Sequence, residues 1–261
     1  MARFEFAMQE FWGFVLVLVR TGAILSAFPI LGTAMVPVRV RVAVVVAISM
    51  VFGPMVMTNV EPGWLTPGKL SLGLMSELLI GLVLGFATRL LLAAVEVAGS
   101  IMGFQLGFGV AVQLDPVTQV ETPVLASFLV ILASLIYFVV DGHHLMLLAL
   151  GTSFSLIPPL HAAANPQLME QATGLMQHSF NLGLKLALPV IAVTFLTYLV
   201  LGIIGRVMPQ MNVLFTGFPL TIGLGLLVLG FGLPLFAGIF QQTILGLETT
   251  LIKLMEEMGG G

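Results

Sequence analysis

The sequence predicts an all-α fold: a polytopic helical membrane protein whose hydrophobic helices are broken and joined in hairpins. Hydrophobic residues make up 59% of the 261 residues, whereas charged residues make up only 8%. A typical soluble domain is roughly 45–50% apolar and about 25% charged. The 9 basic and 12 acidic residues therefore cannot cover a soluble monomer of this length. The 29 glycines and 14 prolines indicate close helix contacts and broken helices.

The same composition excludes several classes of function. A net charge of −3 without any basic run leaves no electrostatic footprint for nucleic-acid binding. The absence of cysteine excludes disulfides, thiol catalysis and cysteine metal sites. Walker-type and Gly-x-Ser-x-Gly motifs are also absent, and the pair His143-His144 lacks the spacing of a metal site. We therefore expect no enzymatic activity, no cofactor and no metal.

The first apolar segment runs from about residue 11 to 31 and carries Arg20 in its middle. Glu5 and Glu10 precede it, and the apolar run is longer than the core of a signal peptide, so we interpret it as structure. A shorter segment over about 42–57 is closed by Gly53-Pro54. The stretch 58–69 is rich in proline and glycine and is typical of a loop.

The middle of the chain carries further apolar segments. One covers about residues 70–92, which is enough to cross a bilayer, since a span needs about 20 residues. A glycine-rich stretch over 99–121 follows, and then an apolar segment over 122–140. Asp141-Gly-His-His separates it from an apolar run that ends near residue 156. The proline-rich stretch 157–167 predicts a second loop.

The last third of the chain contains the longest apolar windows. An amphipathic stretch over 168–181 leads into a segment over 182–205, and residues 207–247 carry no charge. That window has room for two spans, or for one hairpin that bends at Pro219 or Pro234. The tail 248–261 ends in three glycines and is expected to fray. We expect six to eight helical segments in a single membrane domain over residues 1–261.

Ionisable residues inside apolar segments are the first functional candidates, because such charges are costly and usually face protein or water. Glu77, Gly81, Gly85 and Arg89 recur at steps of four, which predicts one slowly drifting helix face. The two glycines let a neighbouring backbone approach closely. We interpret the face as an assembly surface with ion pairs to partner subunits. The alternative is an ordinary membrane helix whose charged side chains reach toward its two ends.

The stretch from Gly99 to Asp115-Pro116 is the most irregular part of the sequence. Each of its glycines weakens a helix by about 1 kcal/mol relative to alanine, and phenylalanine and glutamine side chains alternate with them. Irregular backbone at membrane depth is tolerated only inside protein or beside a water-filled cavity. The residues alone support two interpretations equally: a loop that plugs a pore, and a glycine-rich helix that packs closely on a neighbour.

An ordered series of short motifs runs through nearly the whole chain. After Arg20 it reads Phe28-Pro-Ile30, Val36-Pro-Val-Arg-Val-Arg41, Gly81-Leu-Val-Leu-Gly-Phe86, Gly103-Phe-Gln-Leu-Gly107, Asp115-Pro116, Pro123-Val-Leu-Ala126, Asp141-Gly-His143, Ala187-Leu-Pro-Val190, Gly205-Arg-Val-Met-Pro-Gln-Met-Asn212 and Gly217-Phe-Pro-Leu-Thr221. This series resembles the FliR proteins of the flagellar type III export gate and their virulence-secretion relatives. The departures from the family's pattern are mild. Asp141 stands where asparagine is common, and His144 and Arg41 are additional.

The resemblance implies a non-enzymatic protein of the bacterial inner membrane, within the flagellar basal body. Members of the family assemble in one copy with several copies of FliP and FliQ, and FlhB associates at the base. The assembly is a conical, helically arranged gate for unfolded export substrates. Its helices lie largely above the membrane plane, so membrane lipid covers only part of the apolar surface.

The resemblance also implies roles for individual residues. Gly103–Glu121 would form a plug loop that helps to close the channel, with apolar side chains in the lumen and glycines that let the loop rearrange. Its candidate residues are Gly103, Phe104, Gln105, Gly107, Phe108, Gly109, Val110, Val112 and Asp115. The expected subunit contacts are Arg20, Glu77, Gly81, Gly85, Arg89, Arg206, Pro209, Gln210 and Asn212. For the motif around Arg206, the alternative is a polar helix end followed by a turn.

Other functions compete with the export gate. A secondary transporter that works without FliP and FliQ would also have broken helices and charges within the membrane. The two halves of the sequence carry no apparent inverted repeat, which argues against this alternative. A scaffold without a pore is a weaker alternative. A virulence-secretion homologue is also possible, because no single residue separates the two secretion systems.

Overall fold

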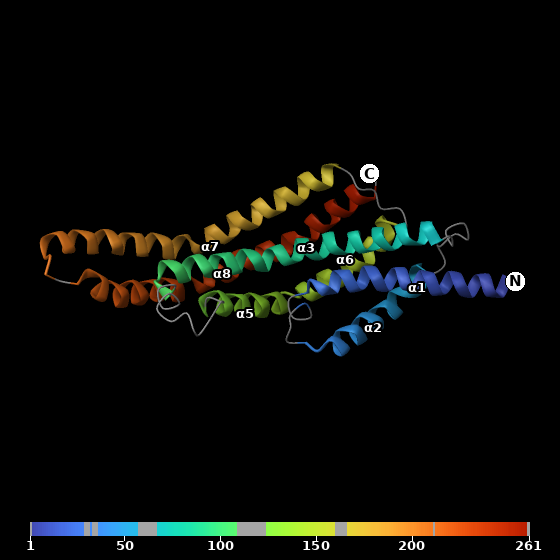
Figure 1. Ribbon diagram of the computed structural model, residues 1–261, viewed down its shortest axis with the longest axis horizontal. Helices are drawn as coiled ribbons and strands as arrows, with labels where there is room; N and C mark the ends of the chain where they lie inside the picture. The colour runs from blue at the N-terminus through green and yellow to red at the C-terminus, as the bar shows by residue number, and fades with distance from the viewer. Residues whose placement is uncertain are drawn as a thin grey trace. The chain divides into compact units, whose positions relative to one another are not determined.

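The computed structural model describes residues 2–28, 32, 36–56, 67–108, 124–159, 166–210 and 212–259 (Figure 1). Within these ranges every regular element is an α-helix, which confirms the all-α prediction. The helices are α1 (Ala2–Ser26), α2 (Val38–Val56), α3 (Pro67–Gln105), α5 (Val124–Val139), α6 (Gly142–Leu156), α7 (Pro166–Val207) and α8 (Val213–Met258).

Four of these helices are long and apolar enough to cross a membrane. They are Met8–Ser26 in α1, Gly68–Gln105 in α3, Gln167–Val207 in α7 and Gly217–Met258 in α8, and the bent pair α5 and α6 would provide one more span. A helix satisfies all its backbone hydrogen bonds internally, as a hydrocarbon environment requires. The protein is therefore a polytopic helical membrane protein.

Three helices are longer than the sequence predicted. The segment expected over about residues 70–92 is part of a longer helix, because α3 continues through Gly99 to Gln105. A Cβ on Gly99 would collide with the backbone of Ala126 in α5, so this glycine permits a close helix contact. The packing gained there offsets the weak helix propensity of glycine. The amphipathic stretch 168–181 and the apolar segment after it likewise form one helix, α7.

The C-terminal region also differs from the prediction. No hairpin interrupts α8, which runs through both Pro219 and Pro234. A proline removes one backbone hydrogen bond, and membrane helices tolerate that loss. The expected frayed tail is wrong up to Met258, because Leu254, Met255 and Met258 are buried. The described part of the tail is thus packed helix.

The chain forms two compact units. Unit 1 comprises Met1–Leu90, Phe138–Leu175 and Ile244–Gly261, and unit 2 comprises Leu91–Tyr137 and Met176–Thr243. Helices α3, α5, α7 and α8 contribute residues to both units, so neither unit is one continuous piece of sequence. The view that residues 1–261 act as a single domain stays a prediction.

Each unit has its own apolar interior. In unit 1, the buried residues of α6 are Gly142, Met146, Leu150 and Ser153, which line one side of that helix. In unit 2, α5 buries Leu125, Leu129, Ala133 and Tyr137 at steps of four residues. One-sided burial of this kind is typical of a helix that packs on one face and leaves the other face to its surroundings. The face of α6 that contains Ser153 supports the candidate site described next.

Candidate functional site

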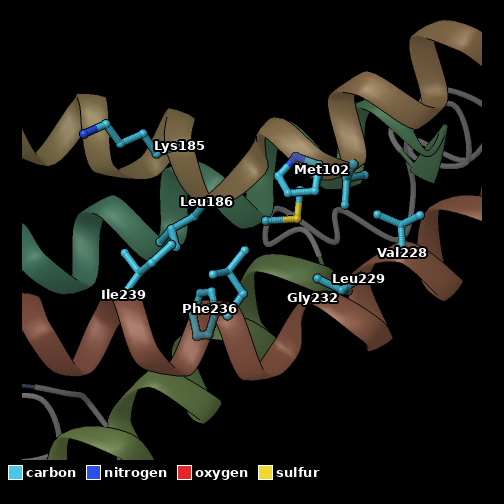
Figure 2. A pocket seen from close by; sticks show the side chains of 11 residues that line it. Met102, Lys185, Leu186, Val228, Leu229, Gly232, Phe236 and Ile239 are labelled. Carbon is cyan, nitrogen blue, oxygen red and sulfur yellow. The ribbon is translucent and has the colours of Figure 1, made fainter.

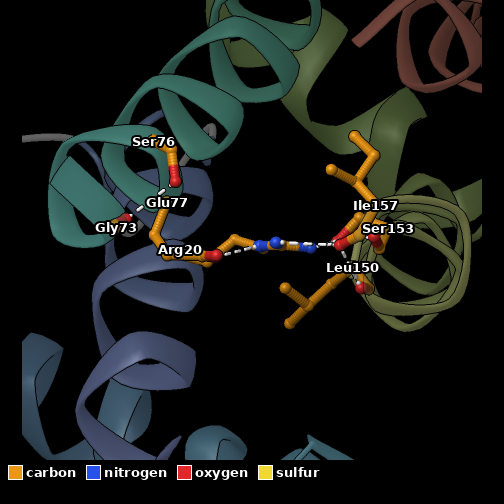
Figure 3. A network of polar contacts seen from close by, with 7 residues as sticks. All are labelled: Arg20, Gly73, Ser76, Glu77, Leu150, Ser153 and Ile157. Carbon is orange, nitrogen blue, oxygen red and sulfur yellow. Dashed lines mark hydrogen bonds and ion pairs between the residues drawn. The ribbon is translucent and has the colours of Figure 1, made fainter. Parts of the chain in front are cut away.

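Arg20, in the middle of α1, lies at the centre of a buried polar network in unit 1 (Figure 3). Its Nε donates to Oε2 of Glu77 on α3 at 2.5 Å. Its Nη1 donates to the carbonyl oxygen of Ser153 at 2.8 Å, and its Nη2 donates to that of Ile157 at 3.1 Å. Neither charged side chain has any exposed surface. The guanidinium therefore joins α1, α3 and the C-terminal end of α6.

An aromatic ring completes the surroundings of this guanidinium. Cζ of Arg20 lies 4.4 Å from the ring centroid of Phe154, which is the geometry of a cation–π contact. The ring of Phe154 lies 6.4 Å from that of Phe52 on α2. Gly151 sits beside the Phe52 ring and leaves it room. The network thus extends to a fourth helix, α2.

This arrangement corrects the prediction that Arg20 and Glu77 pair with partner subunits. The two side chains pair with each other, and both are fully buried within the chain. Burying an unpaired ion costs several kcal/mol, whereas a pair with further hydrogen bonds recovers much of that cost. The C-terminal end of a helix also carries partial negative charge on its last carbonyl groups, which favours a cation at the C-terminal end of α6.

The two predicted contact glycines also act within the chain. A Cβ on Gly81 would collide with the Cβ of Ala23 and with the carbonyl oxygen of Arg20. A Cβ on Gly85 would lie 2.8 Å from the Cβ of Ala27. The prediction that these glycines allow a close backbone approach is confirmed. The approaching backbone belongs to α1 and the residue just after it, so their assignment to a subunit contact is corrected.

Arg89 lies on a different side of α3 from Glu77. Each step of four residues turns a helix about 40° past a full turn, so the three steps from Glu77 to Arg89 rotate the side chain by about 120°. Glu77 is buried and Arg89 is exposed. The prediction that both charges share one face is therefore wrong.

The described part of the predicted plug is the C-terminal end of α3 in unit 2. Gly103, Phe104 and Gln105 are helical, so the expected loop does not start at Gly103. Gly107 has a φ of 88°, which glycine adopts without strain, and its N–H donates to the carbonyl of Phe104. The Tyr198 hydroxyl donates to the carbonyl of Gln105 at 3.0 Å. The helix is thus ended by a glycine and capped from α7.

The two phenylalanines of this segment are exposed within unit 2. Phe104 is 75% exposed and Phe108 is 36% exposed, whereas Leu106 between them is buried. A Cβ on Gly225 of α8 would collide with the Leu106 side chain. Leu106 therefore anchors the end of the helix, and the phenylalanines point elsewhere. The remaining predicted plug residues, Gly109, Val110, Val112 and Asp115, lie outside the described residues.

The predicted contact motif at the end of α7 is exposed. Arg206 lies in the last turn of α7, where a positive charge is favourable for the helix dipole. Arg206, Pro209 and Gln210 are all exposed. Oδ1 of Asn212 accepts a hydrogen bond from the N–H of Phe215 at 3.4 Å, so Asn212 caps the start of α8. Asn212 therefore has a role within the chain as well.

Unit 2 also contains a small apolar cavity between α3, α7 and α8 (Figure 2). Its volume is about 30 Å³, and its lining includes Met102, Leu186, Pro189 and Phe236. Figure 2 shows the amine of Lys185 directed away from these side chains. Ligand pockets are usually about 300–1,000 Å³ and combine apolar walls with converging polar groups. This cavity is therefore too small and too apolar to hold a transported solute.

The ranges described by the structure contain no cluster of three His, Asp or Glu side chains able to hold a metal. Nε2 of His143 lies 3.8 Å from Oδ1 of Asp141, and the His143 ring lies against Phe138. Asp141 has a φ of 57°, and Asn and Asp are the non-glycine residues that most often adopt such a conformation. These residues form the junction between α5 and α6.

Comparison with known proteins decides the family. The profile described as "Bacterial export proteins, family 1" matches residues 11–247. The chain belongs to this family. It is similar to the flagellar biosynthetic protein FliR of Pectobacterium carotovorum subsp. carotovorum, with 35% identity over 87% of this chain and 85% of the relative. The FliR proteins of Bacillus subtilis (strain 168), at 32% identity over 84% and 85%, and of Escherichia coli (strain K12), at 30% over 92% of each, are also similar.

Membership of this family confirms the resemblance that the ordered motifs predicted. It also makes the chain a component of the flagellar export apparatus. The matched residues include Arg20 and Glu77 as well as Gly107 and Arg206. The candidate site thus lies within the part of the chain shared with bacterial export proteins.

Sequence reasoning missed the α6 side of the Arg20 network. Ser153 and Ile157 bind Arg20 through backbone carbonyls, and every residue has such a group. The Ser153 hydroxyl also accepts from Nη1 of Arg20, at 3.3 Å, but one serine in an apolar helix does not stand out in the sequence. Phe154 was equally inconspicuous, since the chain contains 19 phenylalanines. The only available signal was Arg20 itself, a charge that needed partners.

Proposed function

We propose that this export protein is a core subunit of the flagellar type III protein export gate and works only in a heteromeric complex. The expected partners are subunits of the FliP and FliQ kinds, with FlhB at the base, in the bacterial inner membrane within the basal body. The complex would form a channel for unfolded flagellar substrates. This proposal goes beyond the family membership and the names of the relatives, which concern bacterial export and flagellar biosynthesis.

The observation that carries the proposal is the large apolar surface that α7 and α8 leave uncovered. In the 18-residue stretch that makes α7 apolar enough to cross a membrane, only 28% is buried within the chain. In the corresponding stretch of α8, only 11% is buried. Large side chains such as Phe195, Phe215 and Phe231 are exposed. Apolar patches of this size mark interaction or membrane surfaces. A transporter that worked alone would enclose its solute site, and the cavity in unit 2 is too small to serve as one.

The exposed motif after α7 supports the heteromeric proposal. Arg206, Pro209 and Gln210 are polar or turn-forming residues beside long apolar helices, and they stay exposed within the chain. We infer that they contact neighbouring subunits, together with Arg89 on α3. Asn212 would add to such a contact while it caps α8.

The segment that follows α3 is proposed as a plug that helps to close the pore. Phe104 and Phe108 support this role, because both are exposed while Leu106 anchors the helix end. Val110 and Val112 would add apolar side chains in the lumen, and Gly107 and Gly109 would let the segment rearrange. A narrow apolar constriction can exclude ions by dewetting. Gln105 and Asp115 would flank the constriction with polar groups.

Native mass spectrometry tests the assembly directly. The tagged chain is co-expressed with its FliP and FliQ partners and extracted in mild detergent. One copy in a large heteromer supports the export-gate proposal. A monomer or homodimer that ignores those partners overturns it and favours the transporter, for which ion-dependent uptake would then be measured.

A further inference from the structure

Helix α3 presents a continuous apolar face on the side opposite its buried glycines. This surface, called here the outer face of α3, consists of Leu72, Met75, Leu79, Leu82, Phe86 and Arg89. Successive members are three or four residues apart, so they line up along one side of the helix. All six side chains are exposed, the five apolar ones between 37% and 67%. All six belong to unit 1.

The direction of this face follows from the contacts of α3 inside unit 1. Gly81 and Gly85 abut Ala23 and Ala27, and Glu77 binds Arg20. These contacts place α1 against one side of α3. The five apolar side chains of the outer face are turned away from α1 and largely exposed, and Arg89, one step of four residues from Gly85, lies at the edge of this face. Five adjacent large apolar side chains of this kind require a cover other than water.

Lipid alone is a poor cover for this face because of Arg89. A charge that faces the hydrocarbon is costly and is usually paired or turned toward protein or water. Arginine escapes this cost near a helix end by extending to the interface. Arg89 is not at an end of α3, because 16 residues follow it before the helix ends at Gln105, and the first six of them, Leu-Leu-Leu-Ala-Ala-Val, are apolar. Within the described residues, Arg89 makes no ion pair that would neutralise it.

We propose that the outer face of α3 docks an apolar helix of another subunit, and that this helix places a carboxylate opposite Arg89. The proposal rests on the heteromeric function proposed above, because the partner helix belongs to another chain of that complex. The face extends over 18 residues from Leu72 to Arg89, a rise of about 26 Å. This length gives a partner helix that runs alongside α3 nearly five helical turns of contact.

The charge of Arg89 gives a test that separates a partner from lipid. Arg89→Leu would leave the partner's carboxylate buried and unpaired, so recovery of the heteromer should fall at least about tenfold. If Arg89 faced lipid instead, leucine would suit that position at least as well. Recovery at or above the wild-type level therefore overturns the proposal. Lys253→Leu, which removes an exposed charge of unit 1 on α8, is the matched control and should leave recovery unchanged.

Two measurements keep this test independent of folding and of the proposed function. The melting temperature of the purified Arg89→Leu chain without partners should equal that of the wild type, because Arg89 is exposed in unit 1. A lower value would assign the loss to folding and overturn the proposal. The wild-type chain is purified in parallel with its partners. If the wild type forms no heteromer, the proposed function fails; if it does and Arg89→Leu assembles equally well, only the docking inference fails.

The partner and its carboxylate can then be identified. A photo-crosslinking amino acid at Leu82 should form an adduct with another gate subunit, whereas adducts with lipid only would overturn the proposal. In an Arg89→Glu background, each membrane carboxylate of the crosslinked subunit is changed to lysine in turn. One such change should restore most of the lost recovery by exchanging the two charges. If none restores it, the carboxylate assignment is wrong.

Discussion

Arg20 and Glu77 are 57 residues apart in the sequence, yet they form a fully buried ion pair between α1 and α3. Gly81 lies one turn from Glu77 and abuts the carbonyl oxygen of Arg20. The close helix approach and the ion pair therefore depend on each other. Because Arg20 also binds the end of α6, this pair links three helices of unit 1.

The first prediction concerns the two charges of this pair. Arg20→Leu leaves Glu77 buried without its partner, and Glu77→Leu leaves Arg20 in the same position. Each single change should lower the free energy of unfolding by about 3–5 kcal/mol. The double change to leucine should cost clearly less than the sum of the two, because it leaves no unpaired buried charge. Unfolding in mixed detergent micelles measures all three variants, and strict additivity would contradict the pairing.

The second prediction concerns the close approach of α1 and α3. Gly81→Ala adds a methyl group that collides with Ala23 and with the Arg20 backbone. It should lower the free energy of unfolding by about 1–3 kcal/mol. Gly174→Ala is the matched control in α7 of the same unit, since a Cβ there meets nothing within 4 Å. The control should be stabilised by about 0.5–1 kcal/mol, and equal effects of the two changes would rule out a tight contact at Gly81.

Sequence reasoning predicted helix location well and helix length poorly. Apolar windows with few charges located every described helix, because hydrophobic runs of that length have few other structures available in a membrane. The continuity of α3 through Gly99 was not predictable, since it depends on the backbone of Ala126 in a different helix. Pro219 and Pro234 likewise suggested a bend, while α8 continues through both. Local rules overestimate breaks where long-range packing stabilises the helix.

The charged residues of the candidate site could be predicted from the sequence, but the partner of each charge could not. Arg20 and Glu77 were conspicuous because charges are rare in apolar segments. Periodicity placed Glu77 and Arg89 on one face, but the 40° drift per step separates them in the structure. Which charge meets which depends on how α1 packs on α3. Such a contact joins residues distant in the sequence and leaves no periodic signal.

The third prediction concerns the glycine that ends α3. Gly107→Ala forces an L-residue into a left-handed conformation, at a cost of roughly 1–2 kcal/mol. The new Cβ would also lie 3.0 Å from the ring of Phe218 on α8. The melting temperature of the purified chain should fall. Gly223→Ala, at an open position on α8 in the same unit, should leave it unchanged or raise it, so a similar fall in both would contradict the assigned conformation.

The fourth prediction separates a subunit contact from a folding role at Arg206. Arg206 is exposed at the end of α7, so Arg206→Ala should change the stability of the free chain by no more than about 0.5 kcal/mol. Recovery of the heteromer should fall more than recovery of the free chain. Quantitative pull-down of both forms from the same membranes gives the ratio. Equal losses would assign Arg206 to folding alone.

The fifth prediction concerns closure of the pore. Deleting residues 107–113 removes Phe108, Val110 and Val112 while α3 and its anchor Leu106 remain. The gate should still assemble, but an apolar barrier that excludes ions would be lost, so ion conductance should rise. Conductance is measured across planar bilayers that hold the assembled complex, with wild-type complex as reference. A Phe108→Leu variant, which keeps an apolar side chain at this position, is the control. It should stay closed, and unchanged conductance in the deletion would favour a scaffold without a pore.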